Sequence, residues 1–167
     1  MTPDRKLRFV LQEHQGRGHH YDFRLEMGGA LKSWAVPKGP SLDPAEKRLA
    51  LMVEDHDLDH IDYEGIIPEG HYGAGPVVVW DEGTYETMDD DPGKSLGEGR
   101  FSFVLKGKKL KGEFALVRLK RGKRGNEWLM IKKRDGLEQS GWKIRSELDK
   151  KRIARLREKV PSCNSIS

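Results

Sequence analysis

Short runs in which apolar and polar side chains alternate recur through the first 133 residues, and they constrain the fold most strongly. Glycine, proline or aspartate ends each run. Alternation with a period of two is typical of a strand with one buried face, and closely spaced turn residues favour antiparallel neighbours. The runs predict nine short strand segments, for a barrel or sandwich of about eight strands, at 7–14, 19–27, 30–36, 48–56, 76–80, 83–87, 100–106, 110–120 and 127–133. A set of this kind predicts a mainly β protein, either an antiparallel barrel or a sandwich.

The stretch 48–56, RLALMVEDH, can be read as a strand or as a helix. The helix is a fair competitor, because DPAEKRLALM places good helix formers after a possible cap. We favour a strand, which gathers Arg48, Glu54 and His56 on one side. Its apolar face is then predicted to be Leu49, Leu51 and Val53.

Three further features complete the predicted organisation. Residues 57–75 are rich in glycine, aspartate and proline and are expected to form a long functional loop. Residues 76–80 and 83–87 are expected to be a strand pair around Asp81, and 89–93 a turn. Residues 146–160 are predicted to be helical, with Ser146 as cap. The chain therefore divides into a β-barrel domain at 1–136 and a helical tail or cap at 137–167, with Trp34, Trp80 and Trp128 in the core.

Composition indicates the compartment without identifying a partner. The 167 residues carry a formal net charge of +4, with a sequence pI near 9.1, which permits nucleic-acid binding but does not demonstrate it. Cys163 is the only cysteine, so no disulfide framework or thiolate zinc site can form. The start of the chain lacks the apolar stretch of a signal peptide, and no apolar run approaches 18 residues. We expect a soluble cytoplasmic protein with no membrane partner.

The segment HQGRGHHYDFRLE, residues 14–26, carries the chemistry. On a strand, His20, Asp22 and Arg24 point to one face, while Tyr21 and its alternate neighbours point to the other. A turn through Gly16–Gly18 would bring His14 back over the polar face in a hairpin. Two imidazoles and a carboxylate suit Mn²⁺, Fe²⁺ or Zn²⁺, and a guanidinium suits phosphate oxygens. The pattern predicts a metal-assisted phosphate site, although on spacing alone a structural His20–Asp22 pair is the commoner case.

Other residues are candidates to complete this site. His56 has the intrinsic pKa of a proton donor or phosphate ligand. Lys38 and Arg48 could add positive charge, and Gln12 and Glu54 could orient the imidazoles. His19 falls on the opposite face, and His60 and His71 are either solvated or in contact with substrate. The basic runs at 106–111 and 118–124 are either an exposed face or a nucleic-acid track.

Five blocks of sequence, in order, resemble one known family. HHYDFRLE, LKSWAVPKGPS, VEDH, EGIIPEGHYGAG and VVVWDEGTYE are similar to the phosphoesterase domain of bacterial DNA ligase D and its free-standing archaeal and bacterial relatives, from Arg8 to Arg134. The resemblance implies a compact β-barrel and a Mn²⁺-dependent enzyme, with Co²⁺ or Zn²⁺ as other possible metals. It implies removal of a 3′-terminal ribonucleotide and then of the 3′-phosphate, which leaves a 3′-hydroxyl for repair and ligation.

The resemblance also implies roles for individual residues. His14, His20 and Asp22 match the metal ligands, and Arg24 and His56 match the phosphate-contacting and catalytic residues. The supporting phosphate contacts fall on Lys38, Arg48 and His60. The family commonly has a tyrosine where this chain has His60, whose charge is expected to vary with pH and to alter the second step.

The implied partners are nucleic acid 3′ ends on primer–templates, a separate DNA ligase and Ku-type repair proteins. No polymerase or ligase sequence is attached, so the expectation is a stand-alone enzyme. Two alternatives remain at this point. One is a non-catalytic nucleic-acid-binding barrel that recruits a ligase, and the other is a metal hydrolase of small phosphoesters.

Overall fold

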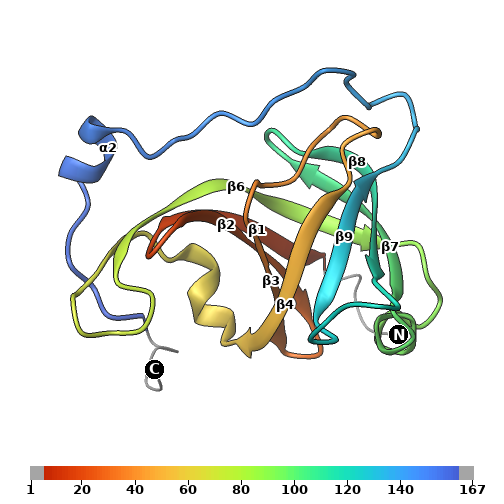
Figure 1. Ribbon diagram of the computed structural model, residues 1–167, viewed down its shortest axis with the longest axis horizontal. Helices are drawn as coiled ribbons and strands as arrows, with labels where there is room; N and C mark the ends of the chain where they lie inside the picture. The colour runs from red at the N-terminus through yellow and green to blue at the C-terminus, as the bar shows by residue number, and fades with distance from the viewer. Residues whose placement is uncertain (1–5, 162–167) are drawn as a thin grey trace.

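The protein is an eight-stranded antiparallel β-barrel, seen in a computed structural model that describes residues 6–161 (Figure 1). The barrel strands are β1 (Leu7–Gln15), β2 (His19–Met27), β3 (Ala30–Val36), β4 (Arg48–His56), β6 (Gly75–Thr87), β7 (Arg100–Gly107), β8 (Lys111–Arg118) and β9 (Glu127–Lys132). They pair in the order β1-β2-β3-β4-β9-β8-β7-β6, and β1–β6 pairing closes the ring. The short β5 (Gly65–Ile67) adds to β6. The predicted barrel is confirmed, and closure excludes the sandwich.

Helical structure is scarce in the described part of the chain and shorter than predicted. A 3₁₀ turn, η1 (Leu58–Asp62), lies within the predicted loop 57–75. The predicted turn at 89–93 instead leads into α1 (Pro92–Gly97), capped by Asp91. The helix predicted at 146–160 is wrong in extent, because only α2 (Lys150–Ala154) is helical and Asp149 caps it. Ser146 is not the cap, since the helix begins four residues later, at Lys150, and the Ser146 hydroxyl instead accepts from Leu148 N–H and donates to the Glu13 carboxylate.

The barrel interior is filled by aromatic and branched side chains. Trp34 and Trp128 are fully buried and meet edge to face at 5.9 Å, and Trp80 is 5% exposed, which confirms the core prediction for the three. The predicted apolar face of β4 is wrong. Leu49 and Val53 are 42% and 39% exposed, whereas Ala50 is buried beside its pairing partner Trp128. The inward positions of β4 are instead Ala50, opposite Trp128, and Met52, which packs against the core.

Residues 75–87 form one strand rather than the predicted pair. The Asp81 side chain is buried and accepts three backbone N–H bonds, from Lys108, Lys109 and Leu110, at 2.7–3.1 Å. Asp81 therefore shapes the turn between β7 and β8 rather than a turn of its own. Gly83 is needed where the backbones approach, since a Cβ there would lie 2.2 Å from the Lys106 carbonyl oxygen.

Replacing Asp81 with alanine should destabilise the protein by roughly 3 kcal/mol, because three backbone donors lose a buried charged acceptor. Urea unfolding followed by circular dichroism measures this change. Glu82→Ala, on the neighbouring half-exposed residue, is the matched control and should change stability by less than about 0.5 kcal/mol. A similar loss in both variants would contradict this role for Asp81.

The C-terminal segment, residues 133–161, crosses the end of the barrel and returns along β5 (Figure 1). Trp142 and Ile144 pack against the core, and Trp80 Nε1 donates to the Arg145 carbonyl at 2.6 Å. Further along, Glu158 pairs in parallel with Ile66. The segment is thus fastened to the barrel at several points. The domain division at residue 136 stays a prediction.

Within residues 6–161 no helix has both the length and the apolar character needed to cross a bilayer. Cys163 lies outside the described residues.

Candidate metal and phosphate site

The β1–β2 hairpin builds the first part of the site. Its register places His14 directly opposite His20, and Gln12 opposite Asp22. On the other face of β2, Tyr21 and its alternate neighbours are buried in the barrel core. The predicted sorting of the two faces of β2 and the return of His14 over the polar face are confirmed.

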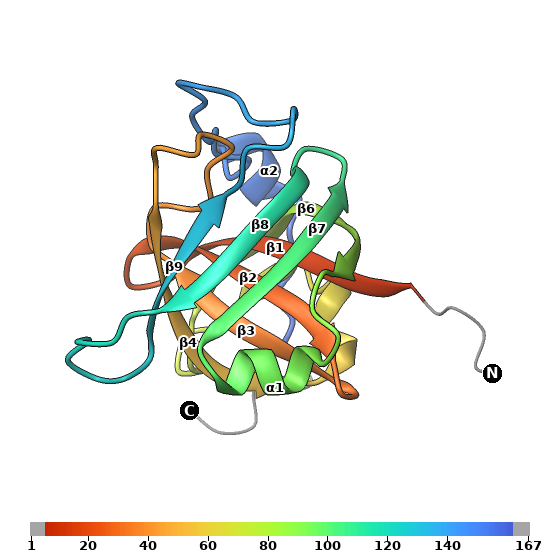
Figure 2. The same ribbon diagram turned by 90° about the vertical axis from the view of Figure 1, so that its right-hand side faces the viewer.

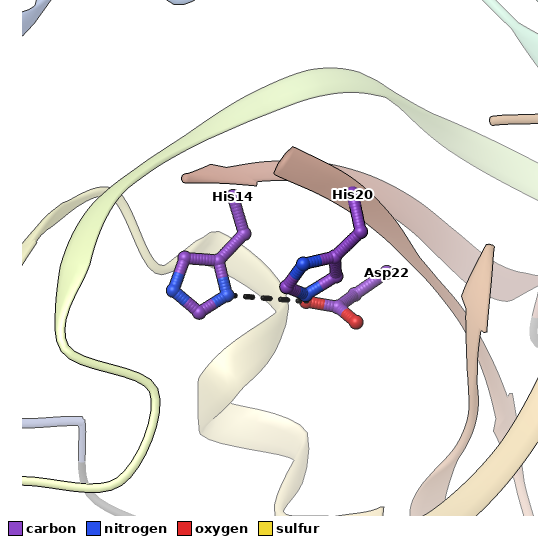
Figure 3. Close-up of side chains that lie close together, drawn as sticks. All are labelled: His14, His20 and Asp22. Atoms are coloured by element: carbon purple, nitrogen blue, oxygen red, sulfur yellow. Dashed lines mark ion pairs between the residues drawn. The ribbon is translucent and has the colours of Figure 1, made fainter. Parts of the chain in front are cut away.

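His14, His20 and Asp22 converge on one point (Figure 3). Their ligand atoms lie within 4.8 Å of one another, with His14 Nδ1 3.7 Å and His20 Nε2 3.3 Å from the same Asp22 oxygen. The other nitrogen of each ring faces a backbone carbonyl: His14 Nε2 donates to Gly73 at 2.6 Å, and His20 Nδ1 to Gly18 at 3.1 Å. These bonds orient each ring so that its other nitrogen faces the carboxylate, where it can bind an ion once it has lost its proton.

The triad has the composition and spacing of a possible metal site. Two donors bound to one ion at about 2.0–2.2 Å lie roughly 3–3.6 Å apart; the His20–Asp22 separation of 3.3 Å falls in this range and the His14–Asp22 separation of 3.7 Å slightly exceeds it. Burial disfavours the charged Asp22, but hydrogen bonds from His14 and His20 and the charge of Arg24 outweigh it and hold its pKa well below the usual range. Burial also opposes a charged His20, yet its contact with Asp22 raises the His20 pKa. The carboxylate is thus ionised and available as a ligand.

Arg24 is buried next to the triad and is held by neighbouring strands. Its Nε donates to Gln12 Oε1 at 2.7 Å and its Nη1 to Ser33 Oγ at 2.9 Å, while Nη2 lies 3.7 Å from Asp22. Gln12 in turn donates from Nε2 to the His60 carbonyl at 2.9 Å. Gln12 was predicted to orient imidazoles, and the structure shows that it orients the guanidinium.

His56 and His60 lie on the far side of Arg24 and are neutral. His56 Nδ1 lies 3.0 Å from Arg24 Nη1 and 3.1 Å from the Glu54 carbonyl oxygen, so it accepts from the guanidinium in one tautomer and donates to the carbonyl in the other. Burial and the Arg24 charge lower the His56 pKa to about 4. Burial, Arg24 and His56 lower the His60 pKa to about 3. The expected change of His60 charge across ordinary pH is therefore wrong, because buried imidazole beside a guanidinium stays neutral.

These groups line a cavity of about 160 Å³. Its wall includes parts of the molecule that are distant in sequence: His14, Asp22, Arg24, Glu54, Asp55, His56, His60, Ile67, Tyr72, Gly73, Val77 and Pro161. Ser33, Gly73 and Pro161 were missed by the sequence analysis. For Ser33 a signal existed, since it is polar on the face of 30–36 opposite the core residue Trp34.

Several other predicted residues lie elsewhere. Arg48 is at the opposite end of β4 from His56, about 26 Å along the strand, so the structure does not bring the two together. Lys38 is exposed beyond β3 and does not line the cavity, and neither does the exposed His71. The Glu54 side chain lines the cavity. His19, on the core side of β2, bonds to Glu13 at 2.6 Å.

The buried neutral His60 should make the metal-free protein less stable in acid. Its pKa rises from about 3 in the folded state to about 6.5 on unfolding, so unfolding takes up a proton between these values. Stability is therefore lost as pH falls through 6.5, by about 2 kcal/mol at pH 5. Urea unfolding in EDTA at pH 8 and pH 5 gives the loss of unfolding free energy between the two pH values. This loss should be smaller by about 2 kcal/mol in His60→Phe, which retains a ring against Tyr63. An unchanged difference would contradict a neutral buried His60.

Comparisons with known proteins agree with this geometry. The model of the DNA ligase D 3′-phosphoesterase domain matches residues 12–118. The chain is 54% identical over 130 residues to a multifunctional non-homologous end joining protein LigD of Pseudomonas aeruginosa, covering 78% of this chain and 15% of that protein. It is 46% identical over 123 residues to the Mycobacterium tuberculosis H37Rv DNA repair protein LigD (72% and 15%) and 43% identical over 135 residues to that of Mycolicibacterium smegmatis (77% and 17%). The chain thus spans less than a fifth of the length of these relatives.

Proposed function

Because the chain belongs to the DNA ligase D 3′-phosphoesterase family, we propose that it is a metal-dependent hydrolase of nucleic acid 3′ ends. It removes a 3′-terminal ribonucleotide and then the remaining 3′-phosphate, leaving a 3′-hydroxyl that a ligase can use in end-joining repair. The substrate is a primer–template, the resident metal is Mn²⁺, and the protein acts in the cytoplasm. A separate DNA ligase and Ku-type proteins are the proposed partners.

One observation supports this proposal above others: a carboxylate with two oriented imidazoles adjoins a buried guanidinium, and His14, Asp22 and Arg24 line one cavity. His14, His20 and Asp22 would hold the divalent ion, which when bound supplies Lewis-acid polarisation of a phosphate oxygen. A structural ion pair has no need for both rings to turn their second nitrogen to a backbone carbonyl. A purely binding barrel has no need for the triad at all.

The remaining residues define what this chain contributes to the reaction. Arg24 is fixed by Gln12 and Ser33, so its donors need no reorganisation when negative charge develops on the phosphate. In the tautomer whose Nδ1 accepts from Arg24, His56 carries its proton on Nε2 and can donate it in a hydrogen bond to a non-bridging oxygen. Because its pKa is lowered to about 4, this role suits His56 better than transfer of the proton to the leaving group.

A labelled primer–template ending in one ribonucleotide tests the function. With Mn²⁺ the primer should shorten to a 3′-phosphate and then gain a 3′-hydroxyl, and EDTA should stop both steps. Release of phosphate from a small phosphoester at a rate independent of salt, with no action on the primer, would instead favour a small-molecule hydrolase. Tight primer binding without turnover in Mn²⁺, Co²⁺ or Zn²⁺ would favour the binding barrel.

A further inference from the structure

A second cavity, which we call the tryptophan groove, lies where the C-terminal segment crosses the barrel. It has a volume of about 600 Å³. Its walls include Trp80 of β6, Lys109 of the β7–β8 turn, and Trp142, Lys143, Arg145 and Glu147 of the C-terminal segment. None of these residues lines the metal cavity.

The tryptophan groove is rigidly built. The Trp80 and Trp142 rings meet at right angles with centroids 6.3 Å apart, and the Trp80 indole N–H donates to the Arg145 carbonyl. The fully buried Glu13 carboxylate accepts the Glu147 backbone N–H at 2.6 Å and the Ser146 hydroxyl. A buried charged acceptor holds the segment in place, so the groove exists before any ligand binds.

The charges of the groove favour an anionic ligand. The Lys109 ammonium lies 4.1 Å above the Trp80 ring and 2.5 Å from a Glu147 oxygen. Lys143 and Arg145 are exposed and form no ion pair with any residue between 6 and 161. Cations beside aromatic rings suit a nucleic acid strand, because phosphates neutralise the cations and bases stack on the rings.

The groove and the metal cavity share β6. Val77 lines the metal cavity, and Trp80, three residues along on the opposite face, lines the groove. Three residues of strand span about 10 Å, which is the axial rise of about three nucleotides of B-DNA. Along β6, the two sites are therefore separated by a distance that the last few nucleotides of a strand can span.

We propose that the tryptophan groove binds the nucleic acid strand upstream of its 3′ end, with Lys143 and Arg145 on phosphates and Trp142 against a base. This inference rests on the proposed function, since it places the 3′ end in the metal cavity. The inference also distinguishes the two basic sequence runs, at 106–111 and 118–124. Lys109, from the run at 106–111, reaches the groove, whereas residues 118–124 lie at the other end of β8 (Figure 2).

Charge reversal at two sites tests the inference by binding alone. In EDTA, where no turnover occurs, the Lys143→Glu/Arg145→Glu variant should bind a labelled primer–template at least ~10-fold more weakly, by fluorescence anisotropy. Its plot of log affinity against log salt should lose about 2 in slope. The control Lys120→Glu/Arg121→Glu has the same charge change on exposed residues at the far end of β8 and should bind like wild type. Equal weakening by both variants, or none by the groove variant, would overturn the groove.

Trp142 tests the stacking contact separately. Trp142→Ala should weaken binding about 10-fold, and Trp142→Tyr, which keeps a ring, should restore most of it. Equal loss in both variants would overturn a stacking role. Turnover of the wild type separates the two proposals. If the groove variants bind the primer weakly but the wild type does not process its 3′ end, the groove is supported and the hydrolase is rejected. If the wild type processes the end but the groove variants bind like wild type, the hydrolase is supported and the groove is rejected.

Discussion

Asp22→Ala should reduce both steps on a ribonucleotide-ended primer at least ~10³-fold, since Lewis-acid stabilisation is worth several kcal/mol and each 1.36 kcal/mol is tenfold in rate. Asp22 contributes the oxygen toward which one nitrogen of each imidazole points, at 3.3 and 3.7 Å. Its removal takes away the one negative charge of the triad and leaves the positive Arg24 beside any bound cation. Mn²⁺ affinity should therefore collapse together with turnover.

Two measurements check this outcome in one variant. Product analysis gives the rate of each step, and electron paramagnetic resonance of free Mn²⁺ gives metal affinity. Asp59→Ala is the matched control, because Asp59 is exposed on η1 and forms no ion pair within residues 6–161. Full activity in Asp22→Ala would reject the metal assignment. Lost activity with unchanged Mn²⁺ affinity would move Asp22 from ligand to another role.

Arg24→Lys should lower turnover by ~10²–10³-fold while Mn²⁺ affinity stays within a few-fold of wild type. Lysine keeps the charge but has one donor group in place of the planar fork. It cannot at the same time reach Gln12 and Ser33 and present donors to a phosphate. The expected loss therefore falls on kcat rather than on metal binding.

Kinetics under saturating Mn²⁺ measure this effect, again with both steps followed separately. Arg17→Lys makes the same chemical change on an exposed residue of the adjoining β1–β2 turn and should leave both steps unchanged. Normal turnover in Arg24→Lys would show that charge alone suffices, and the oriented guanidinium would then have no special role.

Local patterns were enough to predict part of the site. The strand period sorts His20, Asp22 and Arg24 from the core residues between them, and a glycine turn returns His14 within six residues. Both effects act over a few residues, so they can be read without knowing the rest of the fold. The same period placed Leu49 and Val53 on one face of β4 but could not say that this face is outward, because the choice depends on the Trp34–Trp128 pair inside the barrel.

The strand pattern, the clustering of His14, His20 and Asp22 and, through the motifs, the family could all be read from the order of the residues. The groups that support this cluster became apparent only in the folded barrel. The Gly73 carbonyl reaches His14 across 59 positions, Ser33 fixes Arg24, and Pro161 closes the cavity from the far end of the described chain. The folded barrel also decided that His56 and His60 are neutral and that Arg48 lies elsewhere. Burial and the distances between charges depend on barrel closure, because closure brings together strands that are far apart in the sequence.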